Sequence, residues 1–172
     1  MVSTDVLKQF PVFCDLDEEV LRKIARACSM HTYDTGEEIV AQFQPAEKLY
    51  LILNGSIAIE RCLPATRLGH KTGIVRHLKD NEVFGWSSLV EPRIHTISAV
   101  CIESSRTIEI DGEKLLKIMA KNREEGYLLM KALASIIASR LVDTTSHLMS
   151  QMVETERARG TSLWLGRTED ET

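Results

Sequence analysis

The fold is indicated by one short stretch in the first half of the chain, Ser56-Ile57-Ala58-Ile59-Glu60-Arg61. Side chains alternate between the two faces of a strand, so Ile57 and Ile59 share one face and Glu60 lies on the other. This run is one of six β-rich runs, which are separated by glycines and charged turns and cover 38–41, 49–53, 56–62, 73–78, 94–102 and 106–110. Together these runs predict a mainly β fold, either a sandwich or a rolled barrel.

Helices are predicted on both sides of the strands. Near the N-terminus, apolar residues recur at spacings near three and four behind a candidate cap at Asp15, namely Leu16, Val20, Leu21, Ile24 and Ala25. After the strands, the pattern predicts a helix over 114–120 and a much longer one over 124–159, which contains no proline. We therefore divide the chain into a β domain with N-terminal helices (1–122), a long helix (123–159) and a polar, acidic tail (160–172).

The long helix carries an apolar seam at near-heptad spacing, formed by Met130, Leu133, Ile137, Leu141, Thr144, Leu148 and Met152. A β domain that already has its own core leaves little apolar surface to cover so long a stripe. We therefore expect a homodimer joined by this helix, and an ordinary core helix is the alternative.

Composition excludes several classes of protein. The 172 residues include 21 basic and 25 acidic side chains, a formal net charge of −4, which excludes a generally basic protein that coats nucleic acid. No apolar run approaches the roughly 18 residues that cross a bilayer, and the N-terminus lacks the basic and apolar blocks of a secretory signal. We expect a cytoplasmic protein with no membrane contact.

Metal and catalytic motifs are also missing from the sequence. The four cysteines, Cys14, Cys28, Cys62 and Cys101, form no CxxC pair, and the histidines form neither HxH nor HExxH. No phosphate-binding GxxxxGK[ST] loop occurs. We expect buried, reduced thiols, no metal, no cofactor and no enzymatic activity.

Two stretches carry a more specific pattern, Tyr33-Asp34-Thr35-Gly36-Glu37-Glu38-Ile39 and Leu49-Tyr50-Leu51-Ile52-Leu53-Asn54-Gly55-Ser56-Ile57. They resemble the opening motif and the central hairpin of the cyclic nucleotide-binding domain of the catabolite activator protein (Crp/Fnr) superfamily. Between them, Phe43 stands where that family usually has a glycine. The resemblance covers about residues 5–155 and implies a double-stranded β-helix, or jelly roll, with N-terminal helices and a long C-terminal dimerisation helix. It does not extend to the family's DNA-binding helix-turn-helix domain.

The segment 83–99 resembles the phosphate-binding cassette of that family. Gly85 allows a ligand to approach the backbone closely, and a short helix begun at Trp86 to Ser88 would direct free N–H groups towards an anion. Arg93 could then make two charge-assisted bonds to a phosphate. We predict that Gly85, Trp86, Ser87, Ser88 and Arg93 bind a small anionic ligand. The alternative makes Arg93 a solvated cation at a strand edge.

Three departures from the family pattern bear on the ligand, and one of them is the short loop between Leu89 and Arg93. The family's glutamate, which accepts the ribose 2′-hydroxyl, is replaced by Trp86, whose indole cannot accept that bond. A phosphate donor after the arginine is replaced by Ile94, for which Ser87 and Ser88 could compensate. Trp86 and Ile94 therefore imply either altered ribose contacts, with the ring stacked on Trp86, or a different anionic effector.

Two threonines on the long helix complete the predicted site. The segment around Thr144 and Thr145 resembles the part of the catabolite activator protein that carries adjacent hydroxyl residues towards the adenine. Both hydroxyls can donate and accept, so they could read a purine edge. The alternative is that Thr144 is a polar residue of the seam and Thr145 is solvated.

The expected function is a regulatory module that binds a cyclic nucleotide, cAMP, and transmits binding through a dimeric long helix to an unidentified protein partner. We expect no direct DNA binding, because the long helix is not basic and no recognition-helix unit follows Gly160. The alternatives are a protein-interaction module with a degenerate pocket and a sensor of a different anionic effector.

Overall fold

The computed structural model describes residues 2–66 and 69–158, and the chain divides into two compact units, 1–133 and 134–172. Each unit is considered by itself. The first unit contains the helices α1 (Thr4–Leu7), α2 (Glu18–Ala25) and α3 (Gly112–Lys121), and the short 3₁₀ helix η1 (Trp86–Leu89). Its strands are β1 (Cys28–Tyr33), β2 (Glu38–Val40), β3 (Lys48–Thr66), β4 (Gly69–Leu78), β5 (Val83–Phe84) and β6 (Ser98–Asp111). The last helix, α4 (Arg123–Ala158), begins in the first unit and continues into the second.

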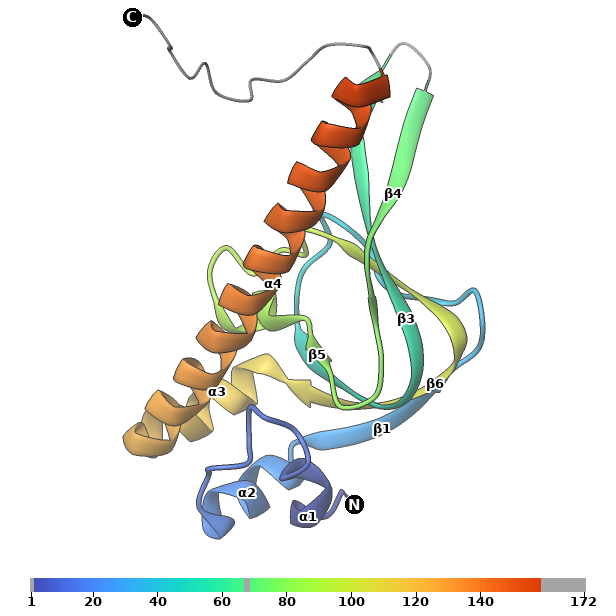
Figure 1. Cartoon of the computed structure of the whole chain (residues 1–172). Coiled ribbons are helices and arrows are strands. Elements are labelled where there is room, and N and C mark those ends of the chain that lie inside the picture. Colours follow the sequence, from blue (N-terminus) through green and yellow to red (C-terminus); the bar gives the residue numbers. More distant parts are fainter. Residues whose placement is uncertain (1, 67–68, 159–172) are drawn as a thin grey trace, which may run out of the picture. The chain divides into compact units, whose positions relative to one another are not determined.

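Within the described residues, six strands form one antiparallel sheet with the order β1-β6-β3-β4 (Figure 1). Strand β2 pairs with β6 and β5 pairs with β3, so β6 is hydrogen-bonded to β1, β2 and β3. The rolled sheet encloses apolar side chains from five strands, namely Val40, Tyr50, Ile52, Ile57, Ile59, Leu78, Phe84 and Ala99. The predicted mainly β fold with flanking helices is confirmed.

The predicted break between residues 53 and 56 was wrong. The two runs form one strand, β3, and Gly55 bends it at a φ of +114° instead of reversing its direction. A Cβ at Gly55 would lie 2.6 Å from the Cα of Ser105 on β6, so no side chain fits between the two strands. The pairing of β3 with β6 shifts register on both sides of this point. Gly55 therefore lets a single strand bend without losing its partner.

Two other strands differ from the sequence prediction. The runs over 94–102 and 106–110 belong largely to one continuous strand, β6. Strand β1 was missed, because four of its six side chains are exposed and follow no alternation. Its place in the sheet comes from backbone pairing with β6, from Cys28 opposite Ile110 to Tyr33 opposite Ser105.

The helices lie close to where the sequence placed them. Helix α2 buries Val20, Leu21, Ile24 and Ala25 as expected. It is capped by Asp17 and not by Asp15, since the Asp17 carboxylate accepts the amide of Glu19 at 2.7 Å. Helix α3 ends at Lys121 and α4 begins at Arg123. Our division of the chain into 1–122, 123–159 and 160–172 stays a prediction, and its tail over 160–172 lies outside the described residues.

Helix α4 has 36 residues, close to the range predicted for it. Leu133, at the end of the first unit, is 2% exposed, whereas Leu141 and Met152 of the seam are 66% and 64% exposed in the single chain. None of the described helices combines the length and the apolar character needed to span a bilayer.

Candidate functional site

The turn that follows β5 is shaped by Gly85. This residue has a φ of +80° and directly precedes η1. A Cβ there would lie 2.7 Å from both the carbonyl oxygen of Lys48 and the ring of Tyr50. Gly85 is therefore required twice, once for its left-handed backbone and once because the start of β3 lies against it.

Helix η1 uses part of its hydrogen-bonding capacity internally. The amide and the hydroxyl of Ser88 both donate to the carbonyl of Gly85, at 3.0 and 2.8 Å. The buried Ser88 also lies against Gly112. A Cβ added at Gly112 would lie 2.8 Å from the Cβ of Ser88. The amide of Ser87, in contrast, has no acceptor among the residues that the structure describes. Of the two serines predicted to bind an anion, Ser87 has the available backbone donor and Ser88 is already engaged.

Arg93 is held at the end of the loop by its backbone. Its amide donates to Val90 at 3.0 Å, its carbonyl accepts from Ala46 at 2.8 Å, and its φ is +55°. The Nε of its guanidinium lies 3.1 Å from a carboxylate oxygen of Glu91, and the side chain is 39% exposed. The predicted cation is thus present and partly accessible, and it lies beside an exposed carboxylate, although its Nε is buried and has no hydrogen-bond partner among the described residues.

A cavity of about 420 Å³ brings Ser88 and Arg93 together. Its other charged residues are acidic, namely Glu47, Asp111 and Glu113. The pKa of Asp111 lies below its ordinary value, mainly because its carboxylate accepts the backbone amide of Lys114, so it is ionised at neutral pH. One cation and three carboxylates therefore line the cavity, and two of these carboxylates, Asp111 and Glu113, also lie 3.6 and 3.2 Å from the ammonium groups of Lys114 and Lys117.

The remaining predicted residues do not line this cavity. Trp86 and Ser87 are half-buried in η1, and the exposed Ile94 pairs with Pro45 through an isolated β-bridge. A second cavity, of about 230 Å³, shares Pro45 and Glu47 with the first and is also lined by Lys48, Tyr50 and His95. Burial lowers the pKa of His95, so this side chain is neutral at pH 7.

A buried polar cluster, which the sequence analysis missed, lies on the strands beside Gly85. Glu109 on β6 is 4% exposed, and its two oxygens accept from the hydroxyl of Tyr33 and from the ammonium of Lys48, the latter at 2.7 Å. Burial alone would raise the pKa of Glu109, but these two donors outweigh it and lower the pKa. Burial, and to a smaller extent the Glu109 carboxylate, raises the pKa of Tyr50 to about 12. Tyr50 stacks on Phe84 with ring centres 4.7 Å apart, so the cluster fixes the strand ends that support Gly85.

The two predicted adenine-reading threonines belong to the second unit. The hydroxyl of Thr145 donates to the carbonyl of Leu141 one turn earlier, at 2.7 Å, which is a common use of a helical threonine. The roles of Thr144 and Thr145 towards a base stay predictions.

The cysteines and the acidic side chains form neither a disulfide nor a metal cluster within the described residues. None of the four cysteines, which all lie in the described residues, forms a disulfide, but Cys14 is exposed and Cys101 is the one that is buried, so the expectation that all of them are buried was wrong. In the described part of the chain, no cluster of three His, Cys, Asp or Glu side chains could hold a metal ion.

Comparison with known proteins places these features in a family. The family model of the cyclic nucleotide-binding domain matches residues 30–122, more than half of the 172 residues. The chain belongs to this family. The matched range runs from β1 to the end of α3 and so contains Gly85, η1 and Arg93. The predicted resemblance is confirmed.

Three members or relatives of the cyclic nucleotide-binding domain family show how far the likeness extends. A CRP-like cAMP-activated global transcriptional regulator of Mycobacterium tuberculosis is 22% identical over 144 residues, which cover 84% of this chain and 61% of that protein. A cAMP-dependent protein kinase regulatory subunit of Eremothecium gossypii is 28% identical over 101 residues, covering 58% of this chain and 20% of that protein. The crystal structure of a putative cyclic nucleotide-binding protein from Geobacter metallireducens superposes with a TM-score of 0.71 at 27% identity, covering 82% of this chain and 99% of that one. The chain thus spans less than two thirds of either curated relative.

Proposed function

We propose that this protein is a regulatory module that binds cAMP and reports the bound state through helix α4 to a protein partner. The observation that carries the proposal is the family match over residues 30–122, which includes the turn at Gly85 and the cation of Arg93. The related regulator of M. tuberculosis is described as cAMP-activated, which supports cAMP as the first ligand to test. A regulatory and not a catalytic role agrees with the relatives named above.

The charges around Arg93 refine the proposal. A phosphate in the 420 Å³ cavity would face Glu47, Asp111 and Glu113, so we do not place the nucleotide phosphate there. We place it at the amide end of η1, where the Ser87 N–H is available and where Arg93 could reach it after leaving Glu91. In this proposal Glu91 competes with the ligand for the same guanidinium.

This competition predicts that substitutions at Arg93 and Glu91 change the affinity for cAMP in opposite directions. Titration calorimetry with cAMP should show weaker binding for Arg93→Ala, by about tenfold to a hundredfold, because a hydrogen bond to a charged group contributes roughly 1.5–3 kcal/mol. Glu91→Gln should strengthen binding, because it removes the competing carboxylate. Lys79→Ala, at an exposed cation of the turn after β4, is the matched control and should bind like the wild type.

The absence of cyclic nucleotide binding by the folded protein would exclude cAMP sensing. A folded wild-type protein that ignores cAMP, cGMP and cyclic dinucleotides at millimolar concentration would leave the partner-recruiting module as the function. The replacement of an acceptor by Trp86 and the existing ion pair of Arg93 favour that second candidate. Trp86→Glu separates the two readings of the indole, because it should strengthen cAMP binding if a ribose acceptor was lost and weaken it if the indole stacks on the ligand.

The proposed signal path requires a homodimer. In the single chain the seam leaves Leu141, Leu148 and Met152 more than half exposed along one stretch of α4. Apolar side chains at near-heptad spacing are typical of paired helices, so a second copy of α4 is the partner that we propose for them. We also propose that the chain does not bind a DNA operator by itself, and a salt-dependent complex with a defined operator in a mobility-shift assay would contradict this.

A further inference from the structure

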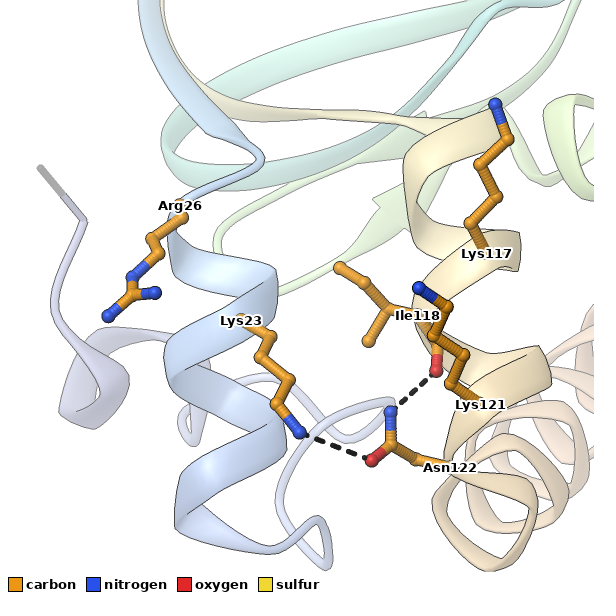
Figure 2. Close-up of a pocket in the computed structure, with 6 residues that line it drawn as sticks. All are labelled: Lys23, Arg26, Lys117, Ile118, Lys121 and Asn122. Carbon is orange, nitrogen blue, oxygen red and sulfur yellow. Dashed lines mark hydrogen bonds between the residues drawn. The ribbon is translucent and has the colours of Figure 1, made fainter.

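A group of basic side chains lies between α2 and α3, away from the residues assigned to the nucleotide. They surround a cavity of about 460 Å³ in the first unit (Figure 2). The cavity is lined by Lys23, Arg26, Lys117, Ile118, Lys121 and Asn122. Four of these six residues are positively charged, although the chain as a whole has a formal net charge of −4. We refer to this feature as the basic pocket.

Two pairs of like charge in the basic pocket oppose the stability of its helices, although Lys23 and Lys117 each also form a favourable pair with a glutamate one turn earlier. Lys117 and Lys121 are four residues apart on α3, so their ammonium groups repel each other across one turn. Lys23 and Arg26 are three residues apart at the end of α2 and are also neighbours of like charge. Favourable interactions with the C-terminal ends of the two helices offset part of this repulsion. The remaining repulsion would be relieved by an acidic partner.

Nearby acidic groups neutralise only part of the charge. Lys23 lies 2.9 Å from Glu19 and also donates to the side-chain oxygen of Asn122, while Lys117 lies 3.2 Å from Glu113. Arg26 on one side and Lys121 on the other are exposed and have no ion-pair partner among the described residues. The basic pocket therefore keeps one uncompensated cation on each of its two walls.

The arrangement of these groups indicates the kind of ligand. Figure 2 shows the charged ends of Arg26, Lys117 and Lys121 pointing in different directions around Ile118, and they do not converge on one point. A single phosphate needs convergent donors, whereas separated carboxylates along a chain can each meet one of these cations. The half-buried Ile118 and the aliphatic stems of the lysines add an apolar surface between the charges.

From this complementarity we propose that the basic pocket binds an acidic protein segment that carries one apolar side chain. The carboxylates of the segment lie against Arg26, Lys117 and Lys121, and its apolar side chain contacts Ile118. A volume of about 460 Å³ is within the range of ligand sites and accommodates a few side chains. Nucleic acid fits less well, since its phosphates would leave the apolar surface at Ile118 uncovered. The pocket uses none of the residues assigned to the nucleotide, so this proposal stands whether or not cAMP binds.

Fluorescence anisotropy with the full chain tests the proposal directly. The probe is a fluorescein-labelled peptide of alternating Asp and Glu with one central Leu. We expect saturable binding that weakens as salt rises from about 50 to 300 mM, because exposed ion pairs are screened. The double variant Lys117→Glu with Lys121→Glu should bind at least about tenfold more weakly, since each reversal turns an attraction into a repulsion. Lys79→Glu, the same charge reversal outside the pocket, should stay within twofold of the wild type.

A further variant and a further probe keep the proposal testable if the double variant fails to fold. Arg26→Glu changes the other wall of the pocket and should also weaken binding, with circular dichroism confirming native helix content. A probe in which the central Leu is replaced by Ser should bind several-fold more weakly. The proposal is overturned if the wild type does not bind the acidic probe, if the double variant binds it equally well, or if an oligothymidylate binds more tightly and displaces it. cAMP titrations are separate, so a failure of either proposal is distinguishable from a failure of the other.

Discussion

Removing the ammonium of Lys48 should destabilise the β domain through Glu109. The change Lys48→Met keeps the length of the side chain and leaves a carboxylate that is 4% exposed with Tyr33 as its remaining side-chain donor. Breaking a buried ion pair costs roughly 3–5 kcal/mol, and a hydrogen bond to a charged group contributes roughly 1.5–3 kcal/mol. Because the Lys48 side chain is 44% exposed and therefore partly screened by water, we expect the lower end, a loss of about 2 kcal/mol.

Urea unfolding at pH 7, followed by circular dichroism, measures this loss. With an m value of about 2 kcal/mol/M, the midpoint should fall by about 1 M. The variant Glu109→Gln provides the control background, because its neutral amide forms no ion pair with Lys48. In that background Lys48→Met should cost less than about 0.5 kcal/mol. An equal loss in both backgrounds, or almost none in either, would refute the reasoning.

The pH dependence gives an independent check on the same carboxylate. The pKa of Glu109 is lowered in the folded protein, so ionisation stabilises the fold above the ordinary value of 4.5 and this contribution is lost as the pH falls through the folded pKa. The difference in unfolding free energy between wild type and Glu109→Gln should be constant from pH 7 to about pH 5 and should shrink below pH 4.5.

Three other predictions concern separate parts of the chain. Gly55→Ala should lower the free energy of unfolding by about 3 kcal/mol or more, because the backbone has a positive φ and the new Cβ would overlap with β6. Gly73→Ala, at a glycine with open space around it, is the control and should change the free energy of unfolding by less than about 1 kcal/mol in the same urea titration. Leu141→Asp should convert the proposed dimer to a monomer in sedimentation velocity at tens of micromolar, and a wild-type monomer there would contradict the seam. Alkylation at pH 8 followed by mass spectrometry should label the exposed Cys14 well before Cys28, because burial raises the pKa of the Cys28 thiol to about 12. Equal labelling rates of the two cysteines would contradict this prediction.

The sequence predicted the elements whose side chains alternate or recur with a clear period. Helix α2 shows its helical period because one face is buried, whereas β3 is buried on both faces over 56–59, where Ser56 and Ala58 are buried as well as Ile57 and Ile59. The one-sided burial expected from the alternation was therefore wrong for this part of the strand. Strand β1 has no such signal, because it is an edge strand whose four exposed side chains are not constrained by its backbone pairing, and only Tyr33, which donates to Glu109, is buried. The bend at Gly55 was read as a reversal, because the sequence does not distinguish a glycine that turns a chain from one that allows close approach of another strand.

The candidate site was predictable only where it is local. The turn at Gly85 and the short helix after it follow from adjacent residues, and the structure contains both. The ion pair between Glu91 and Arg93, and the acidic side chains that line the cavity with Arg93, depend on rotamers and on segments brought together by the fold. The pair formed by Lys48 and Glu109 is separated by 61 positions, so no local pattern reveals it.

The pairing of β6 with three other strands also constrains how the protein is made. Strands β1, β2 and β3 all take hydrogen bonds from a segment that ends at Asp111, and β2 ends at Val40. At about 5–20 residues per second, a ribosome needs about 4–14 seconds to pass from the end of β2 to the end of β6. During that interval the earlier strands have exposed backbone groups and apolar faces without their partner. The nascent chain is therefore most vulnerable to aggregation just before β6 emerges, and slow codons placed after β6 would favour folding whereas slow codons before it would prolong the exposure.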